Sequence, residues 1–203
     1  MAGLALMLGL SGCGLYHRAY PEPADMPTNW RRVATGDDRE RLRNWRTAWT
    51  EALPRARAAD AAAIAAEGVL FDPDRALSAA APPPGTYRCR TFKLGAAGTA
   101  MQEFTAYPWF ECRIIAEGDV LSLHKMTGSQ RPTGLLFRDT DTRLVFLGTL
   151  VLGDETAPLR YGTDSTRDMA GYFERIGDNR WRLVLPYPRF ESILDVVELV
   201  PAG

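Results

Sequence analysis

The chain is short of several residue types, and each shortage limits what the protein can be. Its 203 residues include only two histidines and three cysteines, and 24 basic residues nearly balance 25 acidic ones. A balanced charge without a long block of one sign does not favour nucleic acid or an anionic membrane surface as a partner. The apolar run from Leu4 to Leu10 is far shorter than the roughly 20 residues that span a bilayer.

Motifs for catalysis and cofactor binding are also missing. The sequence contains no Gly-x-Ser-x-Gly elbow, no phosphate-binding glycine loop and no dinucleotide fingerprint. His17 lies in a proline-containing N-terminal segment, and His124 alternates with leucines, so we expect it to face water. We therefore expect a protein that is not an enzyme and that uses neither cofactor nor metal. An enzyme acting on envelope glycans or lipids would instead place a polar cleft around His124 or Arg131.

The N-terminus carries a short apolar run that ends in small residues and a cysteine. The run has the length of a secretion-signal core, and Leu10-Ser11-Gly12-Cys13 resembles the bacterial lipobox, in which cleavage precedes an acylated cysteine. We expect residues 1–12 to be a lipoprotein signal peptide and Cys13 to be lipidated. The alternatives are an ordinary secretory signal with an incidental cysteine, or a buried thiol in a folded N-terminal segment.

The expected lipid anchor also predicts a location. Two or more acyl chains hold a protein durably on a membrane. Gly14 stands where, in the lipoproteins this chain resembles, an aspartate commonly favours the inner membrane. We therefore expect an outer-membrane lipoprotein that faces the periplasm, with a soluble periplasmic protein as the alternative. Residues 13–29 contain three prolines among polar residues and suit an extended tether.

Cys89 and Cys112 remain once Cys13 is assigned to lipid, and an even number of cysteines is typical of an oxidising compartment. In the expected strands, each cysteine shares a face with an aromatic neighbour, so both sulfur atoms can point into one core. We predict a disulfide between them. The rival interpretation is a metal site, but the two histidines do not stand at ligand spacing.

Residues 30–80 form a predicted helical segment. A helix begins near Thr35, whose hydroxyl can cap the first turn, and an apolar stripe runs from Leu42 through Trp45 and Trp49 to Leu53. We interpret the tryptophans as core residues rather than a ligand platform, because large rings contribute much of the burial energy of a helix. The other sides of this helix carry Arg39, Arg41, Arg43 and Arg46.

Residues 85–201 alternate between short β-rich runs and turn residues. The eight expected strands are Thr86–Leu94, Trp109–Ala116, Val120–Met126, Thr133–Phe137, Arg143–Leu152, Met169–Arg175, Arg180–Pro186 and Ser192–Val200. Short turns favour antiparallel pairing, and closure removes exposed sheet edges. The predicted fold is α+β, with N-terminal helices packed on an eight-stranded antiparallel up-and-down barrel or strongly curled sheet, all in one domain.

The run from Leu144 to Leu152 is apolar on both faces. A strand with one solvated face would alternate with polar residues, so something must cover this strand from outside the barrel. We expect that cover to be the helix that carries Trp45 and Trp49.

The most distinctive polar stretch runs from Lys125 to Pro132. Donors on Lys125, Ser129, Gln130 and Arg131 can meet an anionic or peptide ligand at a barrel mouth, where pockets often lie. The alternative is a connecting loop in which Ser129 and Gln130 cap strand ends and Arg131 pairs with an acidic neighbour. The expected partners are the membrane, through the N-terminal lipid, and either an unknown envelope protein or a small apolar or anionic ligand.

Several segments together resemble the bacterial family described as domain of unknown function 4893. The resemblance extends roughly from Trp30 to Pro201 and rests on Trp30–Leu42, Tyr87–Arg90, Lys93–Gly95, Thr127–Pro132, Phe146–Thr149 and Leu183–Pro188. Membership implies an envelope location and provides no activity or catalytic residue.

A looser likeness connects the chain to the small lipocalin-like inhibitors of bacterial metalloproteases. It rests on Cys89 in an early strand, on the second cysteine shortly after, and on the strand-turn segment Gly134–Asp139. We expect a non-enzymatic binding or envelope-maintenance module, and a periplasmic protease inhibitor with a lipocalin-like barrel is the alternative.

Overall fold

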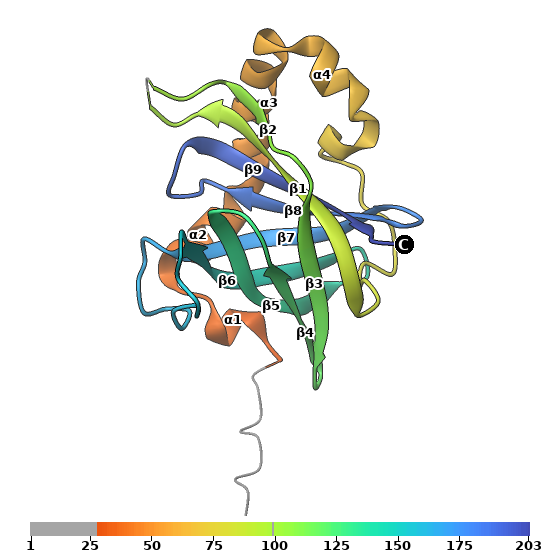
Figure 1. Cartoon of the computed structure of the whole chain (residues 1–203), viewed down its shortest axis with the longest axis vertical. Coiled ribbons are helices and arrows are strands. Elements are labelled where there is room, and N and C mark those ends of the chain that lie inside the picture. The colour runs from red at the N-terminus through yellow and green to blue at the C-terminus, as the bar shows by residue number, and fades with distance from the viewer. Residues whose placement is uncertain (1–27, 99) are drawn as a thin grey trace, which may run out of the picture.

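A closed antiparallel barrel with helices on its outer wall forms the core of the molecule (Figure 1). The computed structural model describes residues 28–98 and 100–203, so the expected signal peptide, Cys13 and nearly all of the tether lie outside the described residues. The predicted α+β fold is confirmed. The strands are β1 (Gly85–Ala96), β2 (Phe104–Ala106), β3 (Phe110–Glu117), β4 (Val120–Lys125), β5 (Gln130–Thr140), β6 (Arg143–Leu152), β7 (Asp168–Gly177), β8 (Arg180–Pro186) and β9 (Ser192–Pro201).

Strand β1 closes the barrel because it pairs with the last strand along most of its length. Its partners on β9 run from Tyr87↔Pro201 to Ala96↔Ser192, while its other edge pairs first with β3 and then with β2. Strand β2 is the additional strand outside the eight-stranded closed circuit. The sequence did not predict it, because three residues are too few to show alternation.

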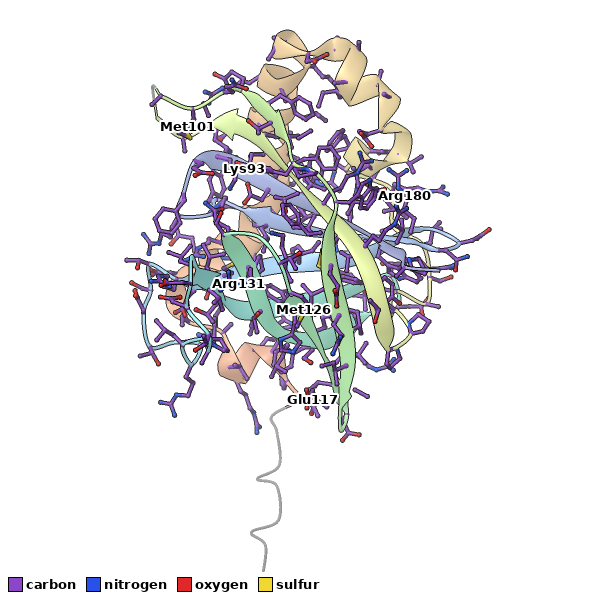
Figure 2. All side chains as sticks on the ribbon, in the orientation of Figure 1. Lys93, Met101, Glu117, Met126, Arg131 and Arg180 are labelled. Atoms are coloured by element: carbon purple, nitrogen blue, oxygen red, sulfur yellow. A yellow bond between two sulfur atoms is a disulfide. The ribbon has the colours of Figure 1, made fainter. Side chains whose placement is uncertain are left out.

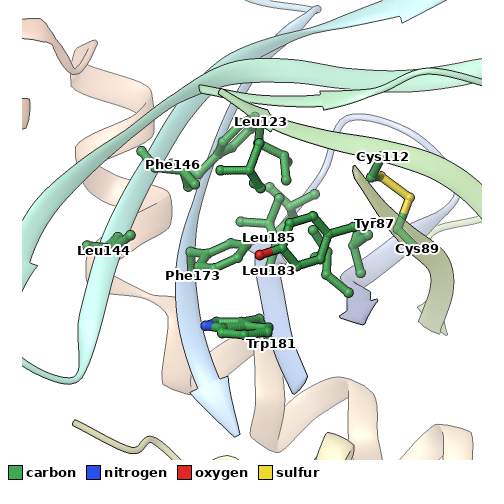
Figure 3. Packing of buried hydrophobic residues seen from close by; sticks show 14 of the residues in the cluster. Tyr87, Cys89, Cys112, Leu123, Leu144, Phe146, Phe173, Trp181, Leu183 and Leu185 are labelled. Carbon is green, nitrogen blue, oxygen red and sulfur yellow. A yellow bond between two sulfur atoms is a disulfide. The ribbon is translucent and has the colours of Figure 1, made fainter. Parts of the chain in front are cut away.

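Apolar side chains fill the barrel interior (Figure 3). The rings of Tyr87 and Trp181 meet edge to face with centroids 5.9 Å apart, and Phe173 is fully buried beside them. The predicted disulfide joins Cys89 of β1 to Cys112 of β3, with the two Cα atoms 5.8 Å apart. Both cysteines are fully buried, so the bridge belongs to the barrel core.

The helical segment is divided more finely than the sequence predicts. Its elements are α1 (Trp30–Val33), α2 (Gly36–Arg43), α3 (Trp45–Ala59), α4 (Ala61–Ala66) and the 3₁₀ helix η1 (Gly68–Phe71). Thr35 caps α2 as predicted, since its Oγ1 accepts a hydrogen bond of 3.2 Å from the backbone N–H of Asp38. The expected single helix from Thr35 through Leu53 is wrong, because the chain leaves helical geometry at Asn44.

The break at Asn44 changes which helix covers which strand. The outward side chains Val145 and Leu147 of β6 pack with Trp30 of α1 and Leu42 of α2. Trp49 of α3 is buried instead in a second cluster over β1, β8 and β9. The strand therefore has the predicted outer cover, but the prediction that the Trp45 and Trp49 helix provides it is wrong. None of the helices in the described part of the chain is both long and apolar enough to cross a bilayer.

Candidate ligand site at the barrel mouth

One end of the barrel is bordered by the β4–β5, β6–β7 and β8–β9 connections, and we call this end the mouth. The connections span residues 126–129, 153–167 and 187–191. Figure 2 shows Lys93 and Arg131 on the side of the barrel where these loops lie. Because side chains alternate along each strand, the last inward-facing residues of the strands point toward this opening.

The cavity inside the mouth is small. Its volume is about 30 Å³, which accommodates about two water molecules, because the apolar side chains of Leu150, Met169, Leu185 and Val197 close it from below. Two wider depressions adjoin it on the surface, one of about 140 Å³ that shares Lys93 and one of about 380 Å³ that shares Arg41. A ligand at the mouth would therefore lie across the barrel end rather than inside the barrel.

Lys93 of β1 lines the central cavity and the adjoining depression, and it forms a buried ion pair. Its Nζ lies 3.0 Å from Oδ2 of Asp195 and 3.3 Å from a carboxylate oxygen of Glu191. Ser192 donates a hydrogen bond of 2.5 Å to the other oxygen of Asp195. Burial opposes the charge on Lys93, but the two carboxylates more than compensate and raise the pKa of Lys93. Lys93 therefore stays charged at the opening.

Lys125 shapes the loop that follows it. Its Nζ donates hydrogen bonds to the carbonyl oxygens of Thr127 at 3.0 Å and Gln130 at 2.9 Å, and it lies 3.7 Å from the ring centroid of Phe110. No carboxylate of residues 28–98 or 100–203 lies within ion-pair distance of it. Burial, with smaller contributions from Arg131 and Lys93, lowers the pKa of Lys125 to about 8.

Arg131 also organises the mouth, but it does not pair with an acidic side chain. Its Nη1 donates to the carbonyl oxygens of Gly128 and Gly153, both at 2.7 Å, and its Nη2 donates to the carbonyl oxygen of Glu155 at 2.7 Å. These bonds tie the β4–β5 loop to the β6–β7 loop. The expectation of an acidic partner is therefore wrong, because the guanidinium donates its hydrogen bonds to backbone carbonyl oxygens instead.

The other residues of the predicted ligand loop are divided between strand and loop. Gln130 and Arg131 are the first residues of β5, whereas the sequence placed them in a connection. Gln130 Nε2 donates to Glu191 Oε1 at 3.3 Å, and Ser129 is exposed. Lys125, Ser129 and Gln130 line the depression beside Lys93, so the structure brings three of the four predicted residues to one surface.

Arg41 is one of several mouth residues that the sequence did not predict. It was assigned to the outer sides of its helix, but it is 9% exposed and lines both the central cavity and the wider depression. Its Nη1 donates to the carbonyl oxygen of Asp168 at 2.8 Å and lies 3.0 Å from Asp38 Oδ1. Its Nη2 is buried and has no hydrogen-bond partner among the described residues.

The lining of the mouth carries basic and acidic side chains in equal number. The central cavity and its two depressions are lined by five basic residues, Arg41, Lys93, Lys125, Arg167 and Arg189, and by five acidic residues, Asp37, Glu40, Asp168, Glu191 and Asp195. Neighbouring carboxylates outside the lining partly balance these charges, as Glu155 does for Arg167 at 2.9 Å. The Arg41 donor that has no partner among the described residues suits a negatively charged group.

His124 lies on the outer wall of the barrel and lines a separate pocket there. The sequence predicted that it faces water, but the side chain is only half-exposed, because residues 158–161 of the β6–β7 connection lie against the same pocket. In the described part of the chain, no group of three or more histidine, cysteine, aspartate or glutamate side chains is placed to hold a metal ion.

Fold and site together define a helix-covered antiparallel β-barrel with a filled interior and a mouth lined by charged side chains. The family model described as Domain of unknown function (DUF4893) matches residues 30–199, and the chain belongs to this family. No curated protein and no solved structure matches the chain.

Proposed function

We propose that this protein is a non-enzymatic binding module of the bacterial envelope, and that its mouth binds a small molecule with an acidic group and an apolar body. The observation that carries this proposal is the buried guanidinium of Arg41, a residue that lines the mouth and whose Nη2 has no hydrogen-bond partner in the described residues. An unsatisfied buried donor costs about 1–3 kcal/mol, more when charged, and an anionic ligand group would recover that cost.

The surroundings of Arg41 supply the rest of such a site. Like Arg41, Arg189 lines the central cavity and the wider depression, and it is partly exposed, so a second guanidinium is within reach of the ligand. Phe190 and Pro188 on the same rim offer apolar contact. The filled barrel argues against an internal lipid, because the central cavity of about 30 Å³ is far smaller than the 300 Å³ or so that ligand pockets usually have.

The mouth can be tested by calorimetric titration of the purified protein with 3-phenylpropionate and with the uncharged 3-phenylpropanol. We expect the acid to bind the wild type and the alcohol to bind about tenfold more weakly, because charged hydrogen bonds contribute about 1.5–3 kcal/mol. The Arg41→Gln variant should lose the difference between the two probes. Arg46→Gln is the matched control, because Arg46 lies in the next helix with an exposed ion pair. Equal binding of both probes to the wild type would reject the site.

We also propose that the mature protein is anchored in the outer membrane, facing the periplasm, through an acylated Cys13. The lipobox-like segment and the disulfide between Cys89 and Cys112 support an exported protein, because disulfides persist in oxidising compartments. Metabolic labelling with a palmitate analogue tests the anchor. The wild type should be labelled and Cys13→Ala should not, whereas equal labelling of both would remove the lipid anchor from the proposal.

A further inference from the structure

A second pocket, of about 310 Å³, lies on the outer wall over β4, β5 and β6. We call it the outer-wall pocket. Residues 158–161 and Val33 of α1 border it, and it shares no lining residue with the mouth cavity or its two neighbouring depressions. Its size falls at the lower end of the range for small-molecule sites.

Strand register gives the outer-wall pocket a polar end and an apolar floor. His124 of β4 pairs with Thr133 of β5, which pairs with Thr149 of β6, so three polar side chains form one outward-facing row. Two residues along, Leu135 of β5 pairs with Leu147 of β6 in the next outward row. A ligand that fits this surface has an apolar body with a polar group at one end.

The polar end contains a hydrogen-bonded chain that fixes the donor and acceptor roles. Ser122 Oγ donates to Glu117 Oε1 at 3.1 Å, and His124 Nε2 lies 3.0 Å from Ser122 Oγ. Because a serine hydroxyl has one hydrogen, His124 Nε2 must donate to Ser122. In the neutral ring, His124 Nδ1 is then an acceptor.

The burial of His124 keeps the ring neutral at neutral pH. Burial lowers the pKa of His124, and Arg113 on the neighbouring strand adds to the effect, while Glu117 opposes it. Arg160 lines the exposed rim of the pocket. The polar end therefore presents a neutral imidazole acceptor beside the Glu117 carboxylate.

Thr149 provides an independent sign that a polar ligand group belongs here. It is 3% exposed, and its Oγ1 has no hydrogen-bond partner within residues 28–98 and 100–203. Buried hydroxyl groups normally have a partner, because leaving one unsatisfied costs free energy. The hydroxyl belongs to a residue that lines the pocket, so a bound molecule can supply the missing partner.

We propose that the outer-wall pocket is a second binding site, specific for a small molecule with an apolar or aromatic body and an amine or similar N–H donor as its head. The body would pack on Leu135, Phe137 and Leu147, and the head would donate to the acceptors at His124 and Glu117. This site has the opposite charge preference to the mouth. The Ser122 hydrogen points to Glu117 rather than to His124, so the trio is arranged for binding and not as a serine nucleophile with its base.

The test is an NMR titration of the ¹⁵N-labelled protein with 2-phenylethylamine, and in parallel with 3-phenylpropionate. We expect the amine to shift amide signals of the outer-wall pocket, and the acid to leave them unchanged. Failure of the mouth proposal would appear separately, as an absence of acid-induced shifts around Arg41. Amine-induced shifts confined to other surfaces, or none, would overturn the outer-wall site.

Two variants and a control identify the contacts. His124→Leu removes the ring acceptor, and Glu117→Gln removes the charge. Each should weaken amine binding about fivefold, in line with a hydrogen bond of about 1 kcal/mol. Thr47→Val, at an exposed helical position, should bind as the wild type does. Wild-type affinity for the amine in both pocket variants would contradict the proposal. If a variant fails to fold, 2-phenylethanol, which lacks the amine, can be compared with 2-phenylethylamine on the wild-type protein and should bind more weakly.

Discussion

Arg182 of β8 donates hydrogen bonds from Nε and Nη2 to Glu174 Oε2 of β7, at 2.9 and 2.7 Å, and neither side chain is exposed. The same guanidinium donates to the carbonyl oxygens of Leu70, Asp72 and Arg75. One outward-facing arginine therefore joins the barrel wall to the segment that follows the helices. The helical layer is fastened by charge as well as by apolar packing.

Replacing Arg182 with methionine should lower the free energy of unfolding by about 3–5 kcal/mol, because it leaves a buried carboxylate with one fewer partner and three carbonyls without a donor. Urea unfolding measures the change. Arg57→Met, at an exposed position in α3, should stay within about 0.5 kcal/mol of the wild type. If Arg182→Met and Arg57→Met were equally stable, the buried pair of Arg182 and Glu174 would make no net contribution to the free energy of unfolding.

Loss of the disulfide should destabilise the barrel core. The Cys89→Ala, Cys112→Ala double variant lacks the cross-link between these two residues, which stand 23 positions apart. Loop-closure entropy predicts a loss of about 3 kcal/mol. The melting temperature measures it, and unchanged melting would contradict the role given to the bridge. Both thiols of the purified wild type should react with maleimide only after reduction.

The buried ammonium of Lys125 predicts a pH dependence of stability. Its pKa is about 8 in the folded state, against 10.5 for an unperturbed lysine. Between pH 8 and 10.5 Lys125 is protonated in the unfolded chain but largely neutral in the folded protein. The free energy of unfolding of the wild type, relative to that of a Lys125→Met variant, should therefore rise with pH in this range and stay constant below about pH 8. Unfolding free energies of both proteins across this range provide the test. A constant difference throughout would contradict the lowered pKa.

The two tryptophans of α3 should contribute unequally. Trp49 is 1% exposed in the cluster over β1, β8 and β9, whereas Trp45 is half-buried against Tyr172, with ring centroids 5.6 Å apart. Trp49→Ala should cost about 3–5 kcal/mol and Trp45→Ala distinctly less. Thermal unfolding of the single variants checks this order. A larger cost at Trp45 would favour a different packing of the helix.

Local patterns predicted the barrel because most of its strands alternate and because tight turns join β3 to β4, β5 to β6 and β7 to β8. The inward positions of Cys89 and Cys112 follow from the same period of two, and Thr35 caps α2 as its hydroxyl predicts. The break at Asn44 was missed because the apolar stripe continues across it in the sequence. The periodicity of apolar residues indicates which face of a helix is buried, but it does not show against which strand that face packs.

The candidate site was harder to predict from the sequence than the fold was, because it depends on contacts between residues that are distant in the chain. The sequence pattern predicts a solvated helix residue at Arg41, but Asp38 and the carbonyl of Asp168, 127 residues away, hold its guanidinium at the mouth. Lys125 and Arg131 look like ligand donors in the sequence, yet backbone carbonyls of the surrounding loops take up their hydrogen bonds. The polar stretch from Lys125 to Pro132 predicted where the mouth lies, but it did not show which hydrogen-bond donors there lack a partner in the described residues.

Chemical-shift mapping with 3-phenylpropionate tests most directly whether the barrel binds an acid across its mouth. The amide signals of Arg41, Lys93 and Arg189 should shift together as the acid is added, and the Arg41→Gln variant should lose these shifts while it keeps its fold. Shifts of the buried core residues instead, or the same titration in Arg41→Gln, would show that the mouth is not the site.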